Sequence, residues 1–289
     1  MDFLRPVTWA EALELKAEHP VARPIAGGTD LMVELNFDKS RPTALLDLTR
    51  VDELTGWEHA GDLIRIGAGV PYARVIGELG DLLPGLAIAS RTVGSPQIRN
   101  RGTIGGNLGS ASPAGDAHPP LLASDAEVEV ESVRGVRVLP IDEFFLRPKV
   151  SALAPDELIR AVRVERAGGP QQFAKIGTRN AMVIAVCSFA LALHPAARRV
   201  GTGIGSAAPT PVRARAADEF LSGALDWAGG GPVAEEVSRR FGELVAGAAS
   251  PIDDVRGTAG YRRHALAVMA RRTLAWTWHD YREGGAVCA

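Results

Sequence analysis

Hydrophobic and polar residues follow one another along the first fifth of the chain in short helical and strand-like runs. Residues 8–11 (TWAE) have the spacing of a capping box, and the apolar residues after them predict a helix that ends near His19. Apolar runs at 22–25 and 44–48 predict strands, and 31–35 predicts a short helix between them. We therefore expect a small α/β unit in this region.

A second unit of strands and helices follows. Residues 63–68 (LIRIGA) alternate in part between apolar and polar, which predicts a strand. Two helices are predicted next, at 72–79 and 84–90. Residues 127–131 (EVEVE) alternate strictly and predict a strand with one acidic face. A turn at Arg134-Gly135 would let residues 136–139 pair with that strand as a hairpin.

A third region begins after Gly168-Gly169-Pro170, a segment typical of a linker. Three strands of an antiparallel sheet are predicted there, at 173–176, 183–193 and 200–204. Three helices are predicted after them, at 214–221, 233–246 and 261–281. The last helix carries an apolar stripe that is expected to pack on the core, formed by Leu266, Met269, Leu274 and Trp278. Its arginines are expected on the solvated face: Arg262, Arg263, Arg271 and Arg272.

The composition is that of an ordinary globular protein. The 289 residues are 46% hydrophobic and 23% charged, enough for one large domain or two to three smaller ones. The formal net charge of −2 argues against non-specific nucleic-acid binding, which needs a basic face. The N-terminus lacks the apolar core of a secretory signal. The best candidate for a membrane span, 181–193, is too short and is expected to form buried core, so we expect a cytoplasmic location.

Cysteine, histidine and serine give no catalytic or metal site. The two cysteines, Cys187 and Cys288, are too few to bind an iron–sulfur cluster and fit a reducing cytoplasm. His118 is expected to be a polar turn residue. The six histidines lack the spacing of metal ligands: His19, His59, His118, His194, His264 and His279. Since no G-x-S-x-G segment is present either, we predict no catalytic side chain and no metal ligand.

Two glycine-rich segments, 27–30 (GGTD) and 102–107 (GTIGGN), carry the clearest chemical signal. Glycine permits positive φ and close approach of the main chain to a ligand, and successive N–H groups in such turns form a nest for an anion. Nearby hydroxyls could donate to phosphate oxygens: Thr29, Thr103, Ser110 and Ser112. Neither segment is a Walker loop or a Rossmann fingerprint. These residues alone fit either a phosphorylated ligand, such as a dinucleotide held between two subdomains, or two structural turns.

The run QIRNRGTIGGNLGSASPAGDAHPPLLA at 97–123 resembles the signature of the FAD-binding subunits of molybdenum hydroxylases. That family includes xanthine dehydrogenase, aldehyde oxidase and carbon monoxide dehydrogenase. Residues 26–35 (AGGTDLMVEL) are similar to the family's first flavin segment, and 173–186 and 205–214 are similar to parts of its C-terminal domain. Residues 261–274 are similar to its final helix. The resemblance covers essentially the whole chain in order.

The resemblance implies an α+β fold. Two FAD-binding subdomains, at 1–57 and 58–167, would form a fold of the vanillyl-alcohol oxidase (PCMH-like) type. Residues 168–289 would form a C-terminal α/β domain of the carbon monoxide dehydrogenase flavoprotein type, with a three-stranded antiparallel sheet. FAD would lie extended between the first two subdomains, with its ring facing the third.

The resemblance also implies which residues bind FAD. Main-chain N–H groups of 25–32 and 103–107 would wrap the pyrophosphate. No residue is expected to act as a catalytic group, because the flavin carries the redox chemistry. The full predicted set is Ile25, Ala26, Gly27, Gly28, Thr29, Asp30, Leu31, Met32, Val93, Thr103, Ile104, Gly105, Gly106, Asn107, Ser110, Asp116, Ile159 and Lys175.

Four side chains in this set have separate implied roles. Asp116 would bond toward the adenosine side or the linker of FAD, and Lys175 would lie near the polar edge of the flavin. Val93 would line the pocket, and Ile159 would pack against the flavin region. Judged without the family, Asp116 would be a turn residue and Lys175 a solvated strand end.

The resemblance implies partners as well. A small subunit with two 2Fe–2S clusters would pass electrons to FAD, and a large subunit would hold the molybdenum cofactor, as a dimer of heterotrimers. NAD, a quinone or oxygen would accept the electrons. Carbon monoxide dehydrogenase flavoproteins typically read AGGHS where this chain reads AGGTD at 26–30, which favours a xanthine dehydrogenase type acting on N-heterocycles or aldehydes. The alternatives are a carbon monoxide dehydrogenase medium subunit, a stand-alone flavin oxidase and a non-catalytic structural subunit.

Overall fold

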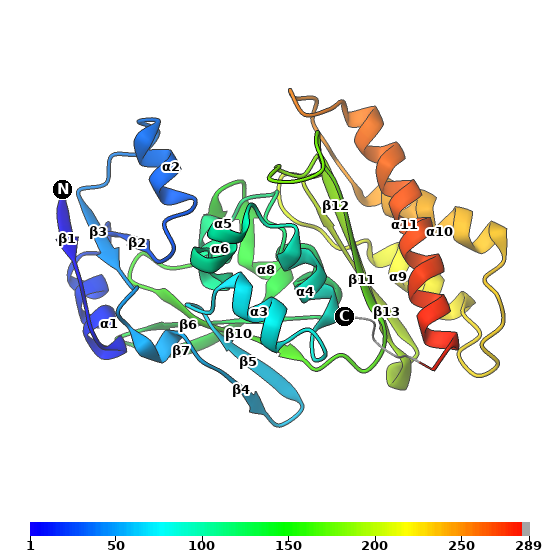
Figure 1. Cartoon of the computed structure of the whole chain (residues 1–289), viewed down its shortest axis with the longest axis horizontal. Coiled ribbons are helices and arrows are strands. Elements are labelled where there is room, and N and C mark those ends of the chain that lie inside the picture. The colour runs from blue at the N-terminus through cyan, green and yellow to red at the C-terminus, as the bar shows by residue number, and fades with distance from the viewer. Residues whose placement is uncertain (285–289) are drawn as a thin grey trace.

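Three larger β-sheets follow one another along the long axis of the molecule, each accompanied by helices (Figure 1). The computed structural model describes residues 1–284. Helices and sheets are mixed within each part, and the last sheet has three antiparallel strands, so the expected α+β class is confirmed. The domain limits given above stay a prediction.

The first sheet is parallel, in the order β1-β3-β2. Its region contains β1 (Asp2–Leu4), α1 (Trp9–Glu18), β2 (Arg23–Ile25), α2 (Leu31–Asn36), β3 (Ala44–Asp47) and the 3-10 helix η1 (Asp52–Leu54). Thr8 caps α1, because its hydroxyl accepts a hydrogen bond from the N–H of Glu11 at 3.2 Å. The predicted helices and strands of this unit are confirmed, and β1 was not predicted.

The second sheet is antiparallel, in the order β4-β5-β10-β6-β7. Its strands are β4 (Trp57–Ala60), β5 (Leu63–Gly67), β6 (Glu127–Ser132), β7 (Gly135–Pro140) and β10 (Leu158–Glu165). Helices and a hairpin accompany it: α3 (Tyr72–Glu78), α4 (Pro84–Arg91), α5 (Pro96–Arg101), α6 (Ile104–Ser110), α7 (His118–Ala123), α8 (Ile141–Phe144), β8 (Phe145–Arg147) and β9 (Val150–Ser151). The predicted 127–139 hairpin is confirmed. The central strand β10 was not predicted, because most of its residues on both faces are buried and a bulge near Ile159 breaks its period.

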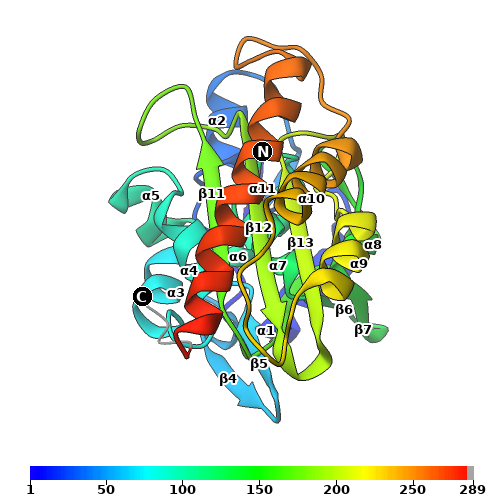
Figure 2. The same cartoon turned by 90° about the vertical axis from the view of Figure 1, so that its right-hand side faces the viewer.

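The third sheet has the order β11-β12-β13 and is covered on its outer face by three helices (Figure 2). Its elements are β11 (Gln171–Ile176), β12 (Cys187–His194), η2 (Pro195–Ala197), β13 (Arg199–Gly205), α9 (Arg215–Ala224), α10 (Glu235–Ala248) and α11 (Ala259–Arg282). The strand predicted at 183–193 begins only at Cys187, because its pairing with β11 ends where Ile176 meets Cys187. Residues 177–186 form a loop instead. Met182 and Ile184 are 57% and 60% exposed, so the prediction of buried core across 181–193 is wrong for its first part.

The prediction that Arg262 lies on the solvated face of α11 is wrong. Its apolar stripe is buried as expected, but the Arg262 side chain is only 2% exposed. It donates to the carbonyl oxygens of Val186 and Ser206 at 2.9 and 2.6 Å and pairs with Asp254 at 2.5 Å. The charge is tolerated in the interior because two carbonyl oxygens and the Asp254 carboxylate replace most of its hydration, although Nε has no partner within residues 1–284.

Two further expectations concern cysteine and membranes. Cys187 is buried in β12 and has no disulfide partner within residues 1–284, and Cys288 lies outside the described residues. Within residues 1–284, none of the helices combines the length and the apolar character needed to cross a membrane.

Glycines on β13 let helix α7 lie directly on the inner face of the third sheet. A Cβ at Gly201 would be 2.0 Å from the carbonyl oxygen of Ala123, and one at Gly203 would be 2.0 Å from that of Pro119. Real Cβ atoms do not approach oxygen so closely, so only glycine permits this packing.

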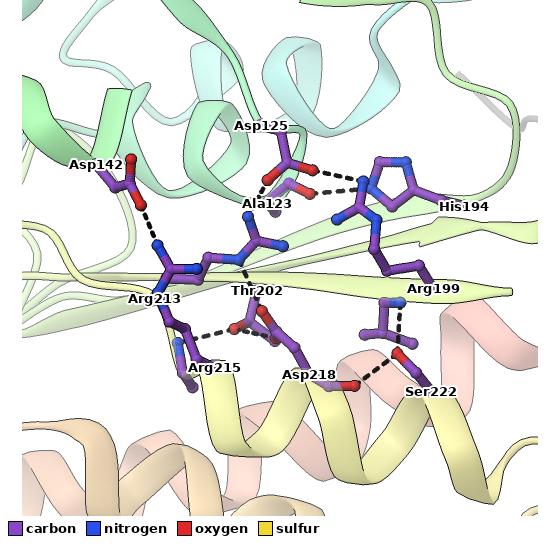
Figure 3. Close-up of polar contacts among 12 residues, drawn as sticks. Ala123, Asp125, Asp142, His194, Arg199, Thr202, Arg213, Arg215, Asp218 and Ser222 are labelled. Carbon is purple, nitrogen blue, oxygen red and sulfur yellow. Dashed lines mark hydrogen bonds and ion pairs between the residues drawn. The ribbon is translucent and has the colours of Figure 1, made fainter. Parts of the chain in front are cut away.

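Charged side chains surround this contact (Figure 3). Arg213 pairs with Asp218 at 2.7 Å and also with Asp125, which in turn pairs with Arg199 at 2.5 Å. Thr202 donates to Asp218 at 2.6 Å. Because Asp125 follows α7 and the other four residues belong to the third unit, the network joins the second unit to the third.

The close contact between Gly203 and the carbonyl of Pro119 predicts that adding one methyl group at residue 203 destabilises the fold. Gly203→Ala should lower the free energy of unfolding by about 3 kcal/mol, because helix and sheet must separate to admit the Cβ. Gly223→Ala is the matched control, since a Cβ there meets nothing within 4 Å and adds helix propensity of at most about 1 kcal/mol. Urea unfolding compares the two variants. Equal stability of both would contradict the packing.

Candidate functional site

A cavity of about 750 Å³ lies between the first two units. Both glycine-rich segments line it, although they are far apart in the sequence. In Figure 1 the segment before α2 faces the α5–α6 region across this part of the molecule. The volume is within the range of about 300–1,000 Å³ usual for small-molecule and cofactor sites.

The two segments touch through their main chains. A Cβ at Gly27 would lie 1.8 Å from the carbonyl oxygen of Arg101, so no other residue fits there. Gly28 has a φ of 73°, which an L side chain rarely adopts. The carbonyl of Gly102 accepts a hydrogen bond from the N–H of Tyr72 at 3.0 Å. The first segment is therefore a tight glycine turn held against the second.

The N–H groups of residues 27–30 have no hydrogen-bond acceptor within the described part of the chain. Four successive free amides beside a cavity form a nest that suits an anion. The predicted anion-binding chemistry of this segment therefore agrees with the geometry.

The main-chain N–H groups of the second segment, 102–107, are not arranged as predicted. It is the start of helix α6, capped by Thr103, whose hydroxyl accepts from the N–H of Gly106 at 3.0 Å. The N–H groups of Ile104, Gly105 and Asn107 donate to carbonyls of Val70, Ala68 and Thr103. These amides are already engaged, so they do not form a free nest. The glycine is needed for packing, because a Cβ at Gly105 would lie 2.7 Å from the Ala68 carbonyl oxygen.

Most of the predicted cofactor residues come together at the cavity. Three do not line it: Ile104 is fully buried in the core, Met32 points to solvent, and Lys175 lines a neighbouring cavity. The Ser110 hydroxyl donates to the carbonyl of Asn107 at 2.9 Å, in its own helix. The predicted residues that line the cavity are Ile25, Ala26, Gly27, Gly28, Thr29, Asp30, Leu31, Val93, Thr103, Gly105, Gly106, Asn107, Ser110, Asp116 and Ile159.

Asp116 and Lys175 form a buried ion pair, with Oδ2 and Nζ 2.6 Å apart. The Lys175 ammonium also donates to the carbonyl of Thr92 at 3.2 Å. Burial raises the pKa of Asp116 to about 6, although Lys175 opposes the shift. Its Oδ1 atom is buried and has no partner in the described residues. Neither residue is therefore the solvated turn or strand end that the sequence alone would suggest.

His118 is a core residue and not the polar turn residue that was expected. It begins α7 fully buried, with Nε2 3.2 Å from the carbonyl oxygen of Asn107 and its ring against Phe145. Burial lowers its pKa to about 4, so the ring is neutral near pH 7. A Cβ at Gly115 would overlap the ring, which explains the glycine there.

Several lining residues carried no sequence signal. Lys149, at the β8–β9 turn, reaches Asp30 at 3.0 Å and Glu34 at 3.4 Å, so it joins the hairpin to the first segment and α2. Tyr72 lies on the wall beside Gly102, and Arg23 lies at the edge of β2. These contacts join segments far apart in the chain, and no local pattern indicates them.

A second cavity of about 450 Å³ adjoins the first. The two share lining residues from 94–95 and 182–183. No Asp or Glu occurs among the described residues that line it. Its cationic residues are Arg91, Arg99, Lys175 and Arg179. The lining therefore suits an anionic ligand.

Family models match nearly the whole chain. Residues 1–166 match the FAD binding domain in molybdopterin dehydrogenase, and residues 172–277 match the CO dehydrogenase flavoprotein C-terminal domain. The chain is 30% identical to the nicotine 6-hydroxylase medium subunit of Paenarthrobacter nicotinovorans, over 94% of this chain and 95% of that one. It is also 30% identical to a putative xanthine dehydrogenase FAD-binding subunit of Escherichia coli K12, over 94% of both chains.

Solved structures of carbon monoxide dehydrogenases have the same fold. A chain of the enzyme from Hydrogenophaga pseudoflava that lacks the Mo-pyranopterin moiety superimposes with a TM-score of 0.87 at 27% identity, over 96% of this chain and 97% of that one. A chain of the reconstituted enzyme from Oligotropha carboxidovorans gives a TM-score of 0.88 at 26% identity, over 96% and 98%. The expected PCMH-like fold with its three-stranded C-terminal domain is confirmed by this likeness.

The raised pKa of Asp116 predicts a pH dependence of stability. Between about pH 4, where an Asp in an unfolded chain titrates, and about pH 6, the folded chain binds more protons at this group. The stability of wild type relative to Asp116→Asn should therefore fall as pH rises through this window, by about 3 kcal/mol.

Urea unfolding of both chains at several pH values measures this difference. Asp62→Asn, at an exposed position, is the control for the loss of one carboxylate. A difference that is flat, or that grows as pH rises, would contradict a buried carboxyl with a raised pKa.

Proposed function

Because this chain belongs to the family of FAD-binding subunits of the molybdenum hydroxylases, we propose that it transfers electrons inside a heteromeric complex. It is a flavoprotein oxidoreductase subunit, and its cofactor is FAD. In the proposed complex, 2Fe–2S clusters of a small subunit deliver electrons to this chain, and NAD or another acceptor removes them. A large subunit holds the molybdenum cofactor, in a dimer of heterotrimers.

The residues at the main cavity fit FAD. The free amides of 27–30 would hold the pyrophosphate, and the hydroxyls of Thr29 and Thr103 lie on the same lining. Asp116 and Asn107 each have a buried oxygen with no partner among the described residues, which suits hydroxyl or amine groups of a bound ligand. When bound, FAD supplies the redox chemistry, and the protein supplies binding, orientation and exclusion of water.

The match over nearly the whole length to medium subunits is the observation that carries the proposal. Several relatives are named for N-heterocycles: nicotine, xanthine, nicotinate and caffeine. Together with AGGTD at 26–30, these names favour a xanthine dehydrogenase type of complex that hydroxylates an N-heterocycle or an aldehyde. The second candidate is a medium subunit of carbon monoxide dehydrogenase, favoured by a relative of that name at 28% identity.

The second cavity supports NAD as the acceptor. Three of its cations, Arg91, Arg99 and Arg179, have no carboxylate partner within residues 1–284 and suit the pyrophosphate of a nicotinamide dinucleotide. Lys175 is already paired with Asp116. The second cavity also shares part of its wall with the FAD cavity. An uncharged quinone or oxygen would gain nothing from these cations. The rival classes predict other behaviour: a stand-alone flavin oxidase would be reduced by its own substrate without partners, and a structural subunit would not hold FAD.

Reduction by NADH tests the acceptor. NADH added without oxygen to the purified complex should bleach the visible flavin band, because transfer to an acceptor is reversible near equilibrium. Arg91→Gln should raise the half-saturating NADH concentration about 10-fold, since Arg91 lines the second cavity without another recorded side-chain partner in residues 1–284.

Arg166→Gln is the control, because Arg166 is exposed and lines neither cavity. Bleaching by a reduced quinone and none by NADH would overturn NAD as the acceptor. Bleaching by an N-heterocycle with this chain alone would favour the stand-alone oxidase.

A further inference from the structure

Tyr72 occupies a central position at the FAD cavity. It is the first residue of α3, and its N–H donates to the Gly102 carbonyl at 3.0 Å. A Cβ at Gly102 would be 3.5 Å from the Tyr72 ring and 3.3 Å from the Thr29 hydroxyl. The ring therefore lies beside the point where the two glycine-rich segments meet.

The Tyr72 hydroxyl is buried and has no hydrogen-bond partner in the described part of the chain. The residue is 2% exposed, yet it lines the cavity. An unpartnered buried hydroxyl costs about 1–3 kcal/mol, so such groups are rare unless they serve a function. A phenylalanine would fill the same volume without this cost.

Burial raises the pKa of Tyr72 well above its ordinary value, and the negative charge of Asp116 adds to the shift. The phenol is therefore neutral near pH 7 and keeps its proton for donation. The hydroxyl makes no hydrogen bond to Asp116 or to another base within residues 1–284, so the neutral phenol is suited to donating a fixed hydrogen bond to a ligand.

Two further unpartnered atoms belong to residues on the same lining. Asn107 Oδ1 and Asp116 Oδ1 are both buried and have no partner within residues 1–284. Three unsatisfied polar atoms around one cavity indicate a polar ligand surface and not a single packing defect. An amide oxygen and an ionised carboxylate oxygen can only accept hydrogen bonds, so the Tyr72 hydroxyl is the donor of the three.

We propose that the Tyr72 hydroxyl is a binding group for FAD, donating a hydrogen bond to an oxygen of the bound cofactor. The inference rests on this chain binding FAD. It adds a side-chain donor on the wall formed by α3, a part of the cavity outside the glycine-rich segments and the residues that the family resemblance implies.

Tyr72→Phe separates binding from folding. The variant should bind FAD about 10-fold more weakly, as expected for the loss of one hydrogen bond to a ligand. The FAD-free variant should be as stable as wild type or more stable, because the unpaired hydroxyl is gone. Fluorescence titration of the FAD-free full chain gives the affinity, and thermal unfolding without FAD gives the stability.

Tyr281→Phe is a control with the opposite expectation. The Tyr281 hydroxyl donates to the carbonyl of Trp227 at 2.8 Å, away from the cavity. Its loss should lower the stability of the FAD-free chain and leave FAD affinity unchanged. The pair of variants therefore distinguishes a ligand contact from an internal one.

Two results would overturn the proposal alone: wild-type FAD affinity in Tyr72→Phe, or a loss of FAD-free stability, which would mean that the hydroxyl has a partner within the protein. Failure of the wild-type chain to bind FAD would overturn the cofactor assignment as well. It would be recognised because adding FAD to the wild-type chain would cause no saturable change in fluorescence. Weaker binding with undiminished FAD-free stability supports the role of Tyr72.

Discussion

The cavity depends on a main-chain contact that leaves no room for a side chain. A Cβ at Gly27 would overlap the carbonyl of Arg101, so the two glycine-rich segments meet backbone to backbone. The same rule applies where Gly105 meets Ala68. These contacts fix the start of α6, and the amides of 27–30 beside the cavity have no partner within residues 1–284. The two segments thus have different roles: the first provides free donors, and the second provides a rigid wall.

The third unit also packs against the second through glycines that leave no room for a side chain. Glycines on β13 let α7 lie against the sheet, and the ion pairs around Arg213 surround that contact. The Asp116–Lys175 pair then connects the lining of the main cavity to β11. The main cavity, proposed to hold FAD, meets the second cavity, which is lined by cations, near this pair. The cofactor and its proposed electron acceptor would therefore lie next to each other.

The sequence predicted features that follow from local patterns. The alternation of EVEVE indicates β6. The two glycine-rich segments, 27–30 and 102–107, stand out in the sequence, and both line the main cavity. Contacts between distant segments were not predictable. Which amides stay free depends on the carbonyls of Ala68 and Val70, and the burial of Arg262 depends on residues from three other segments. Tyr72 looks like any aromatic residue at a helix start until its surroundings are known.

Hydrogen exchange of the full chain with and without FAD tests the central claim most directly, because it reports on individual amides. FAD should slow exchange at 27–30, where the amides have no acceptor in the part of the chain that the structure describes. Exchange at 104–107 should change little, since those amides already donate within the protein. Protection by FAD at 104–107 with none at 27–30 would contradict the assignment of the first segment as the anion-binding nest.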